Sequence, residues 1–155
     1  MALFWHSMEY RVAQLSDAQT LATFRKQQLI DEGQIPDVDI DRALTEYFEA
    51  SLANGSLVQY VAVDNNAIVA TGGVHFYLYP PSFRNATGKM AYIANIYTMP
   101  DFRKKGIATA ILDLLVKEAE MRGYCVIRLQ ATDQGHSVYE KYGFVDTPGF
   151  MTLRL

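Results

Sequence analysis

One short basic segment has residue types and spacing suited to binding a phosphate group. Residues 103–108 read RKKGIA and lie between an apolar segment typical of a β-strand and another typical of a helix. The first backbone N–H groups of a helix have no acceptor within it, and the helix dipole places positive charge behind them. Such a helix start binds anions, and Gly106 lets a phosphate approach the backbone closely. The spacing therefore predicts an anion site suited to a pyrophosphate.

This segment differs from the two better-known phosphate loops. The chain contains no G-x-x-x-x-G-K-[ST] and no G-x-G-x-x-G. A P-loop of the Walker type and the dinucleotide-binding fingerprint are therefore both excluded. Taken alone, R-x-x-G-x-A also fits the basic first turn of an ordinary amphipathic helix, so the elements around it decide its meaning.

Hydrophobic periodicity and turn residues predict the elements that must position this loop. We expect strands over 9–15, 57–63, 67–79, 90–98, 124–129 and 149–155, and helices over 17–32, 40–54, 107–122 and 136–142. Hairpin strands that lead into a βαβ unit imply a mixed sheet carrying helices. Gly72-Gly73 should mark a bulge or a close backbone approach, and Gly123 should follow the end of a helix. With no repeat or linker, residues 1–155 are predicted to form one domain.

Composition and charge exclude several classes of function. The 155 residues include 14 Lys and Arg against 17 Asp and Glu, a net charge of −3, which is unlike a duplex nucleic-acid-binding protein. No apolar run approaches the ~18 residues of a membrane span, and Met1–Met8 lacks the basic region of a signal peptide. The single cysteine, Cys125, cannot form an intrachain disulfide. We therefore expect a cytoplasmic protein with neither nucleic acid nor membrane as partner.

A second segment, downstream, makes the pattern specific. Arg103-x-x-Gly106-x-Ala108 is followed by YEKYGF over residues 139–144. Together they resemble the GCN5-related N-acetyltransferase (GNAT) superfamily, with residues 91–145 as the matching region. The resemblance implies a single α/β domain with a twisted, mostly antiparallel mixed sheet, a central βαβ unit and helices on both faces.

The resemblance also implies a reaction and a set of coenzyme contacts. Members of this superfamily transfer the acetyl group of acetyl-CoA to an amine of a small molecule or protein. Backbone N–H groups of the basic loop would bind the pyrophosphate, and a strand edge would pair with the amides of pantetheine. The contacts so implied are Ile96, Tyr97, Thr98, Arg103, Lys104, Lys105, Gly106, Ile107, Ala108 and Thr109. For this edge to be open, the strands containing Thr98 and Tyr124 should diverge at that end.

Tyr139 stands where many superfamily members place a general acid. A phenol with a reference pKa of ~10 is close enough to a thiol to protonate a departing CoA thiolate. The alternative is an aromatic side chain packed on the sheet, as we expect for Tyr142 and Phe144. The three histidines and one cysteine show no metal-ligand spacing, so no metal is expected.

The general base remains unassigned by the sequence. Many superfamily members carry a glutamate on the strand before the phosphate loop, but residues 90–98 include no carboxylate. Either a water relay held by Asn95, Tyr97 or backbone carbonyls accepts the ammonium proton, or a base comes from elsewhere. His75 is a candidate for the acceptor cleft or a structural histidine, and His136 could contact CoA or cap its helix. Cys125 is expected to be a small core residue.

The acceptor side and a competing function stay open. Residues 31–41 hold five carboxylates and no Lys or Arg, so they could attract a cationic acceptor or form an ordinary solvated loop. A non-catalytic acyl-CoA-binding sensor or regulatory module is the alternative function, because the strand carboxylate is missing. The sequence leaves the oligomeric state open, with a homodimer as one arrangement it allows.

Overall fold

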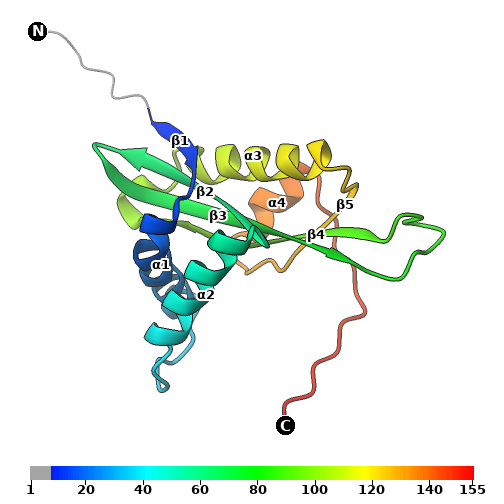
Figure 1. Ribbon diagram of the computed structural model, residues 1–155, viewed down its shortest axis with the longest axis horizontal. Helices are drawn as coiled ribbons and strands as arrows, with labels where there is room; N and C mark the ends of the chain where they lie inside the picture. Colours follow the sequence, from blue (N-terminus) through cyan, green and yellow to red (C-terminus); the bar gives the residue numbers. More distant parts are fainter. Residues whose placement is uncertain (1–7) are drawn as a thin grey trace, which may run out of the picture.

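The computed structural model describes residues 8–155 as a five-stranded sheet with helices on both faces (Figure 1). The prediction that Met1–Met8 is not a signal peptide concerns residues that lie largely outside this range. The strands are β1 (Glu9–Val12), β2 (Leu57–Asp64), β3 (Ala67–Leu78), β4 (Lys89–Thr98) and β5 (Val126–Leu129). The helices are α1 (Ala18–Asp31), α2 (Asp41–Asn54), α3 (Ile107–Met121) and α4 (His136–Tyr142), with 3-10 helices η1 (Leu15–Asp17) and η2 (Pro100–Phe102). No helix among these residues has the length and apolar character of a membrane span.

The sheet follows the chain order β1-β2-β3-β4-β5. The first three pairings are antiparallel, whereas β4 and β5 are parallel and are joined through α3. This confirms the mixed, mostly antiparallel sheet and its βαβ unit. The basic loop therefore lies in the connection between the end of β4 and the start of α3.

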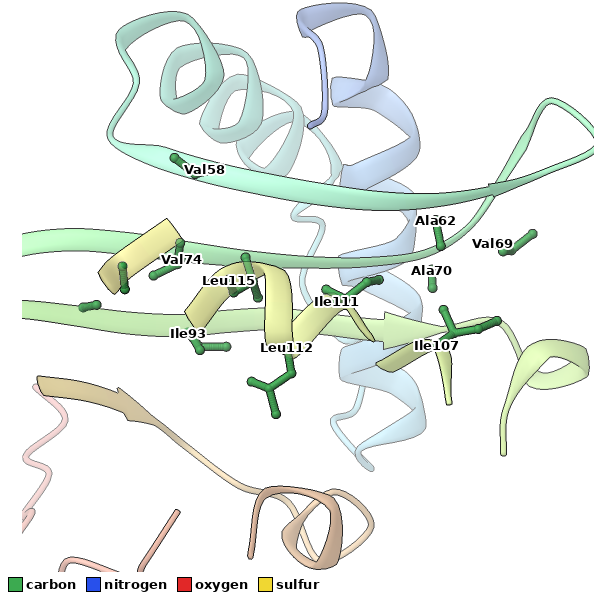
Figure 2. Close-up of a cluster of buried hydrophobic side chains, with 12 residues drawn as sticks. Val58, Ala62, Val69, Ala70, Val74, Ile93, Ile107, Ile111, Leu112 and Leu115 are labelled. Atoms are coloured by element: carbon green, nitrogen blue, oxygen red, sulfur yellow. The ribbon is translucent and has the colours of Figure 1, made fainter. Parts of the chain in front are cut away.

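Two apolar clusters fill the two faces of the sheet. On one face, Ile111 and Leu115 of α3 are completely buried with Val74 and Ile93 of the strands (Figure 2). On the other, Phe48 of α2 packs in a cluster with side chains of α1 and β2. Burying one such side chain contributes about 1.5–3 kcal/mol. These contacts hold α3, and with it the basic loop, in a fixed place on the sheet.

The expected irregularity at Gly72-Gly73 is confirmed in both of its forms. The register between β3 and β4 shifts between Thr71 and Gly73, which is a bulge. A Cβ on Gly72 would lie 2.6 Å from Cγ2 of Ile111, too close for real atoms. The missing side chain therefore lets α3 approach the sheet closely.

Two predictions near the C-terminal end of the chain are wrong. Residues 149–155 form no strand, so β5 is the last strand of the sheet. Their alternating pattern favours a strand, but a strand forms only where a second backbone pairs with it. Cys125 is exposed rather than a core residue, because β5 begins only at Val126 and Cys125 lies in the irregular segment just before it.

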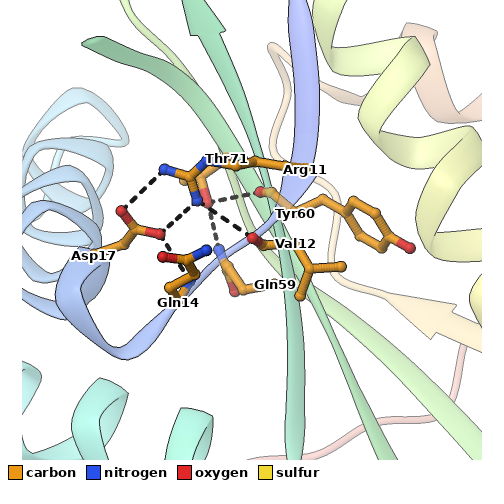
Figure 3. A network of polar contacts seen from close by, with 7 residues as sticks. All are labelled: Arg11, Val12, Gln14, Asp17, Gln59, Tyr60 and Thr71. Atoms are coloured by element: carbon orange, nitrogen blue, oxygen red, sulfur yellow. Dashed lines mark hydrogen bonds and ion pairs between the residues drawn. The ribbon is translucent and has the colours of Figure 1, made fainter. Parts of the chain in front are cut away.

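A polar network ties β1 to the start of α1 (Figure 3). Arg11 binds Asp17 through two bonds, Nη1 to Oδ2 at 2.7 Å and Nη2 to Oδ1 at 3.1 Å. The backbone N–H of Gln14 donates to the same carboxylate at 2.7 Å. Asp17 is the N-cap residue of α1, but its side chain makes no capping bond to that helix. The bonds from Arg11 and Gln14 hold the pKa of Asp17 below its ordinary value, although burial opposes them.

Replacing Asp17 with Asn should lower the free energy of unfolding by about 1–3 kcal/mol at pH 7, because it breaks a partly buried charge-assisted pair. The pKa of Asp17 is lowered in the folded state. Its contribution is therefore present above the unfolded pKa and is lost as the pH falls through the folded one. Urea unfolding should show a difference between the two proteins that shrinks below about pH 4. The exposed Asp101→Asn serves as the control, and equal losses for both variants would contradict this role.

Candidate functional site

Two left-handed residues shape the loop that enters α3. Lys104 has φ 60°, and Gly106, the N-cap of the helix, has φ 78°. No backbone carbonyl among residues 8–155 accepts a bond from the N–H groups of Lys104 to Thr109, and the first bond into the helix runs from Ala110 N to Gly106 O at 3.0 Å. Left-handed residues among ordinary ones turn successive N–H groups toward one concavity. The loop therefore offers the donors that the sequence predicts for an anion.

The Arg103 side chain is used within the protein. Its Nε donates to the Thr98 carbonyl at 2.9 Å, and its Nη2 pairs with Asp31 Oδ2 at 2.8 Å. The guanidinium also lies 5.6 Å from the centre of the Tyr97 ring. Arg103 therefore joins the loop to the end of β4 and to α1, and its backbone N–H is also used, because it donates to the Pro100 carbonyl at 3.2 Å. The exposed Lys104 and Lys105 supply the positive charge at the loop surface.

The edge of β4 opens beside this loop. β5 pairs only with the stretch from Met90 to Ile93, although β4 continues to Thr98. Asn95, just beyond the last pair, is buried and has φ 59°. A left-handed residue other than glycine costs about 1–3 kcal/mol and marks functional sites more often than other places. The expected divergence of the two strands is confirmed, and Asn95 marks its start.

The three predicted contacts on β4 differ in what surrounds them. Ile96 is partly buried against the α3 face, while Tyr97 is buried on the other face and meets Phe24 edge-on at 5.3 Å. The buried hydroxyl of Thr98 has no hydrogen-bond partner among the described residues. The groups of residues 96–98 that are suited to pair with an extended ligand are therefore the backbone groups and the Thr98 hydroxyl.

Tyr139 lies on α4, partly buried against the cluster that includes α3. Its ring meets that of Phe144 at 6.1 Å, edge-on. It borders a cavity of about 810 Å³ whose lining includes Tyr92, Leu129 and Gln130. Burial raises the pKa of Tyr139, and the charge of Glu32 raises it further, so the phenol stays protonated at neutral pH. Packing and proton donation are compatible roles for this side chain.

The C-terminal end of α1 links the loop to Tyr139. Asp31 binds Arg103 of the loop, and the next residue, Glu32, acts electrostatically on Tyr139. No local pattern predicts this link, because Asp31 and Arg103 are 72 residues apart in the chain. The end of α1 thus connects the basic loop with α4, near the place where β4 and β5 diverge.

The acidic stretch at 31–41 is partly neutralised within the protein. Asp31 pairs with Arg103, and Asp41 Oδ1 lies 2.6 Å from Lys26 Nζ. Asp39 accepts a bond from the backbone N–H of Asp41. Among residues 8–155, Glu32 and Asp37 take part in no ion pair. The field available to attract a cationic acceptor is therefore smaller than the residue count suggests.

The histidines considered from the sequence both have partners. His75 Nε2 lies 2.7 Å from the Tyr47 hydroxyl, and burial lowers the pKa of His75, so it is neutral at pH 7. His136 Nε2 lies 3.0 Å from Asp146 Oδ1, and this bond raises the pKa of His136. His75 thus joins α2 to β3, and His136 joins α4 to the segment after it.

Comparison with known proteins places these features in a family. The model of the acetyltransferase (GNAT) family matches residues 19–144. A solved structure of a predicted acetyltransferase with acetyl-CoA, from Clostridium acetobutylicum, is 47% identical over 96% of both chains, with a TM-score of 0.91. A GCN5-related N-acetyltransferase from Ralstonia eutropha is 24% identical over 96% of this chain and 99% of its own, with a TM-score of 0.87, and supports the fold alone. No curated protein matches the chain.

Replacing Gly106 with Glu should abolish binding of coenzyme A, measured by calorimetry, while the protein stays folded. The change puts a negative charge and a side chain beside the free N–H groups, at a φ of 78° that favours glycine. Gly55→Glu is a matched control, since Gly55 has φ 73° and also has open space around it. It should lose similar stability but keep coenzyme affinity. Unchanged affinity in Gly106→Glu would rule out this loop as the pyrophosphate site.

Proposed function

Because the chain belongs to the acetyltransferase (GNAT) family, we propose that it moves the acetyl group of acetyl-CoA to a primary amine of a small molecule or protein by direct attack. The observation that carries the proposal is the pair of contacts made by the C-terminal end of α1. Asp31 binds Arg103 of the loop with free N–H groups, and the charge of the next residue, Glu32, raises the pKa of Tyr139. A phosphate-binding backbone and a protonated phenol thus border the opening between β4 and β5.

The chain's residues fit the coenzyme in two places. The N–H groups of Lys104 to Thr109 have no backbone acceptor among the described residues, and open space surrounds the Cα of Gly106. They would bind the pyrophosphate, as at other helix starts. The unpaired edge of β4 beyond Ile93 would pair with the pantetheine amides as with a peptide strand. Both contacts would orient the thioester toward α4.

Tyr139 would protonate the leaving group. The ammonium of the acceptor first loses one proton, and its nitrogen then attacks the thioester carbon. The new C–N bond forms, the C–S bond breaks, and the nitrogen loses a second proton as the amide forms. One proton reaches the sulfur through Tyr139 and the other goes to solvent. Since burial and Glu32 raise the pKa of Tyr139, its phenol carries the required proton throughout the physiological range.

The alternative is a module that binds acyl-CoA without turnover. It is favoured by one observation, the absence of a carboxylate on β4. Incubation with acetyl-CoA and a panel of amines, followed by mass spectrometry, separates the two functions. A product heavier by one acetyl group supports the transferase, whereas saturable coenzyme binding without any product supports the module.

Replacing Tyr139 with Phe should lower kcat by about 10²-fold or more, with little change in acetyl-CoA affinity, because only the proton donor is removed. Tyr142→Phe is the matched control on the same helix. The Tyr142 hydroxyl donates to Asp113 at 3.1 Å, so this variant should lose some stability but keep kcat. Steady-state kinetics and calorimetry supply the two readouts, and normal turnover of Tyr139→Phe would leave Tyr139 as a packing residue.

A further inference from the structure

A row of paired side chains crosses three strands at the cavity of about 810 Å³. Tyr92 of β4 pairs with His75 of β3 on one side and with Arg128 of β5 on the other. Side chains of directly paired residues point to the same face of a sheet. His75 contacts Tyr47 of α2, so the row points to the face that carries α1 and α2. The cavity, which is lined by Tyr77, Tyr92 and Arg128, therefore lies over the face opposite α3.

The cavity reaches the opening between β4 and β5. The last paired residues before the opening are Ile93 and Leu129, and Leu129, Gln130 and Tyr139 all line the cavity. Arg128 stands one position before that last pair. A molecule in the cavity can therefore have one end at Arg128 and the other beside the proposed proton donor. The volume of the cavity lies within the range of about 300–1,000 Å³ that is typical of small-molecule sites.

Arg128 carries a positive charge that no anionic group of the described chain neutralises. No carboxylate of residues 8–155 lies within ion-pair distance of its guanidinium. The guanidinium lies 5.5 Å from the centre of the Phe150 ring, an attraction that uses none of its five N–H donors. Arg128 is also partly buried, and removing an unpaired charge from water is costly. Its donors, in a fork that matches the geometry of an oxyanion, are therefore available to a ligand.

The other charged groups of the cavity lie on α4 and on the segment after it. Asp146 is paired with His136 at 3.0 Å. Glu140, which follows Tyr139 directly, is exposed and takes part in no ion pair within residues 8–155. The cavity therefore has an unpaired positive charge on β5 and an unpaired negative charge on α4, beside the proposed acid. Much of its remaining lining is aromatic or aliphatic, with Tyr92 as an example.

We propose that the acceptor is a small molecule that carries both an amine and an oxyanion, and that Arg128 binds the oxyanion. This inference rests on the proposed function, because it names the class of acceptor for that transfer. The guanidinium would bind a carboxylate or phosphate of the acceptor through two parallel bonds. Glu140 would attract the ammonium end toward Tyr139, and the carbon skeleton would lie against the aromatic side chains. Such an acceptor complements both charges of the cavity, whereas a polyamine would bring a positive charge against Arg128.

Matched pairs of amines test the class of acceptor. Each pair consists of an amine with an oxyanion and its neutral counterpart: the common amino acids with their amides, and phosphoethanolamine with ethanolamine. In steady-state kinetics the charged member of at least one pair should have a kcat/KM about 10- to 100-fold higher, the effect of hydrogen bonds to a charged group. The preferred pair shows whether a carboxylate or a phosphate is bound. A preference for the neutral members, for polyamines or for amines of peptides would overturn the proposal.

Replacing Arg128 with Gln removes the charge and keeps a polar side chain. The preference within the chosen pair should fall to about one, mainly through a higher KM for the charged member. Arg84→Gln is the matched control, since Arg84 is exposed, takes part in no ion pair of the described residues and does not line the cavity. This control should keep the full preference. An Arg128→Gln protein with the same preference as the unchanged chain would overturn the role of Arg128.

Calorimetry with the same amines, in the presence of coenzyme A, separates failure of this site from failure of the transferase. Charged members that bind the unchanged chain but not Arg128→Gln would support the site even if no amine is acetylated, and only the proposed transfer would then fail. If no charged member binds, or if Arg128→Gln binds them equally well, the oxyanion site is overturned whatever the turnover.

Discussion

The close packing of α3 on the sheet is the constraint on which the rest of the site depends. Ile111 reaches the sheet at Gly72, where any side chain would collide with it. Free N–H groups at a helix start bind an anion only if the helix does not move away from it. The apolar contacts of α3 supply that rigidity, so a glycine far from the loop in sequence helps to position the loop.

The site itself arises where regular structure ends. β4 loses its parallel neighbour after Ile93, turns through the left-handed Asn95 and continues to the loop with one edge unpaired. α1 ends at the same place and contributes Asp31 to the loop. The backbone groups that a regular sheet and helix would use internally are thus left for a ligand.

Much of this arrangement can be predicted from the sequence, because it depends on residues that are close together in the chain. The apolar stripe of α3, the bulge at Gly72-Gly73 and the place of Gly123 after the end of α3 are properties of neighbouring residues, and these are confirmed. The coenzyme contacts that the R-x-x-G-x-A spacing predicts stay a prediction. The Asp31–Arg103 pair and the failure of residues 149–155 to form a strand depend on partners distant in the chain. The prediction for Cys125 is wrong because apolar neighbours indicate a strand but do not determine its first residue.

Two restraints of different physical character hold the basic loop at residues 103–106. Behind it, α3 is fixed by buried apolar contacts that salt strengthens or leaves unchanged. In front, the Asp31–Arg103 pair has side chains 28% and 40% exposed, so dissolved ions screen it. Raising the ionic strength therefore loosens the loop from α1 without releasing it from the sheet. At high salt, the contact between the loop and α1 is therefore more mobile than the packed α3 and sheet to which the loop is attached.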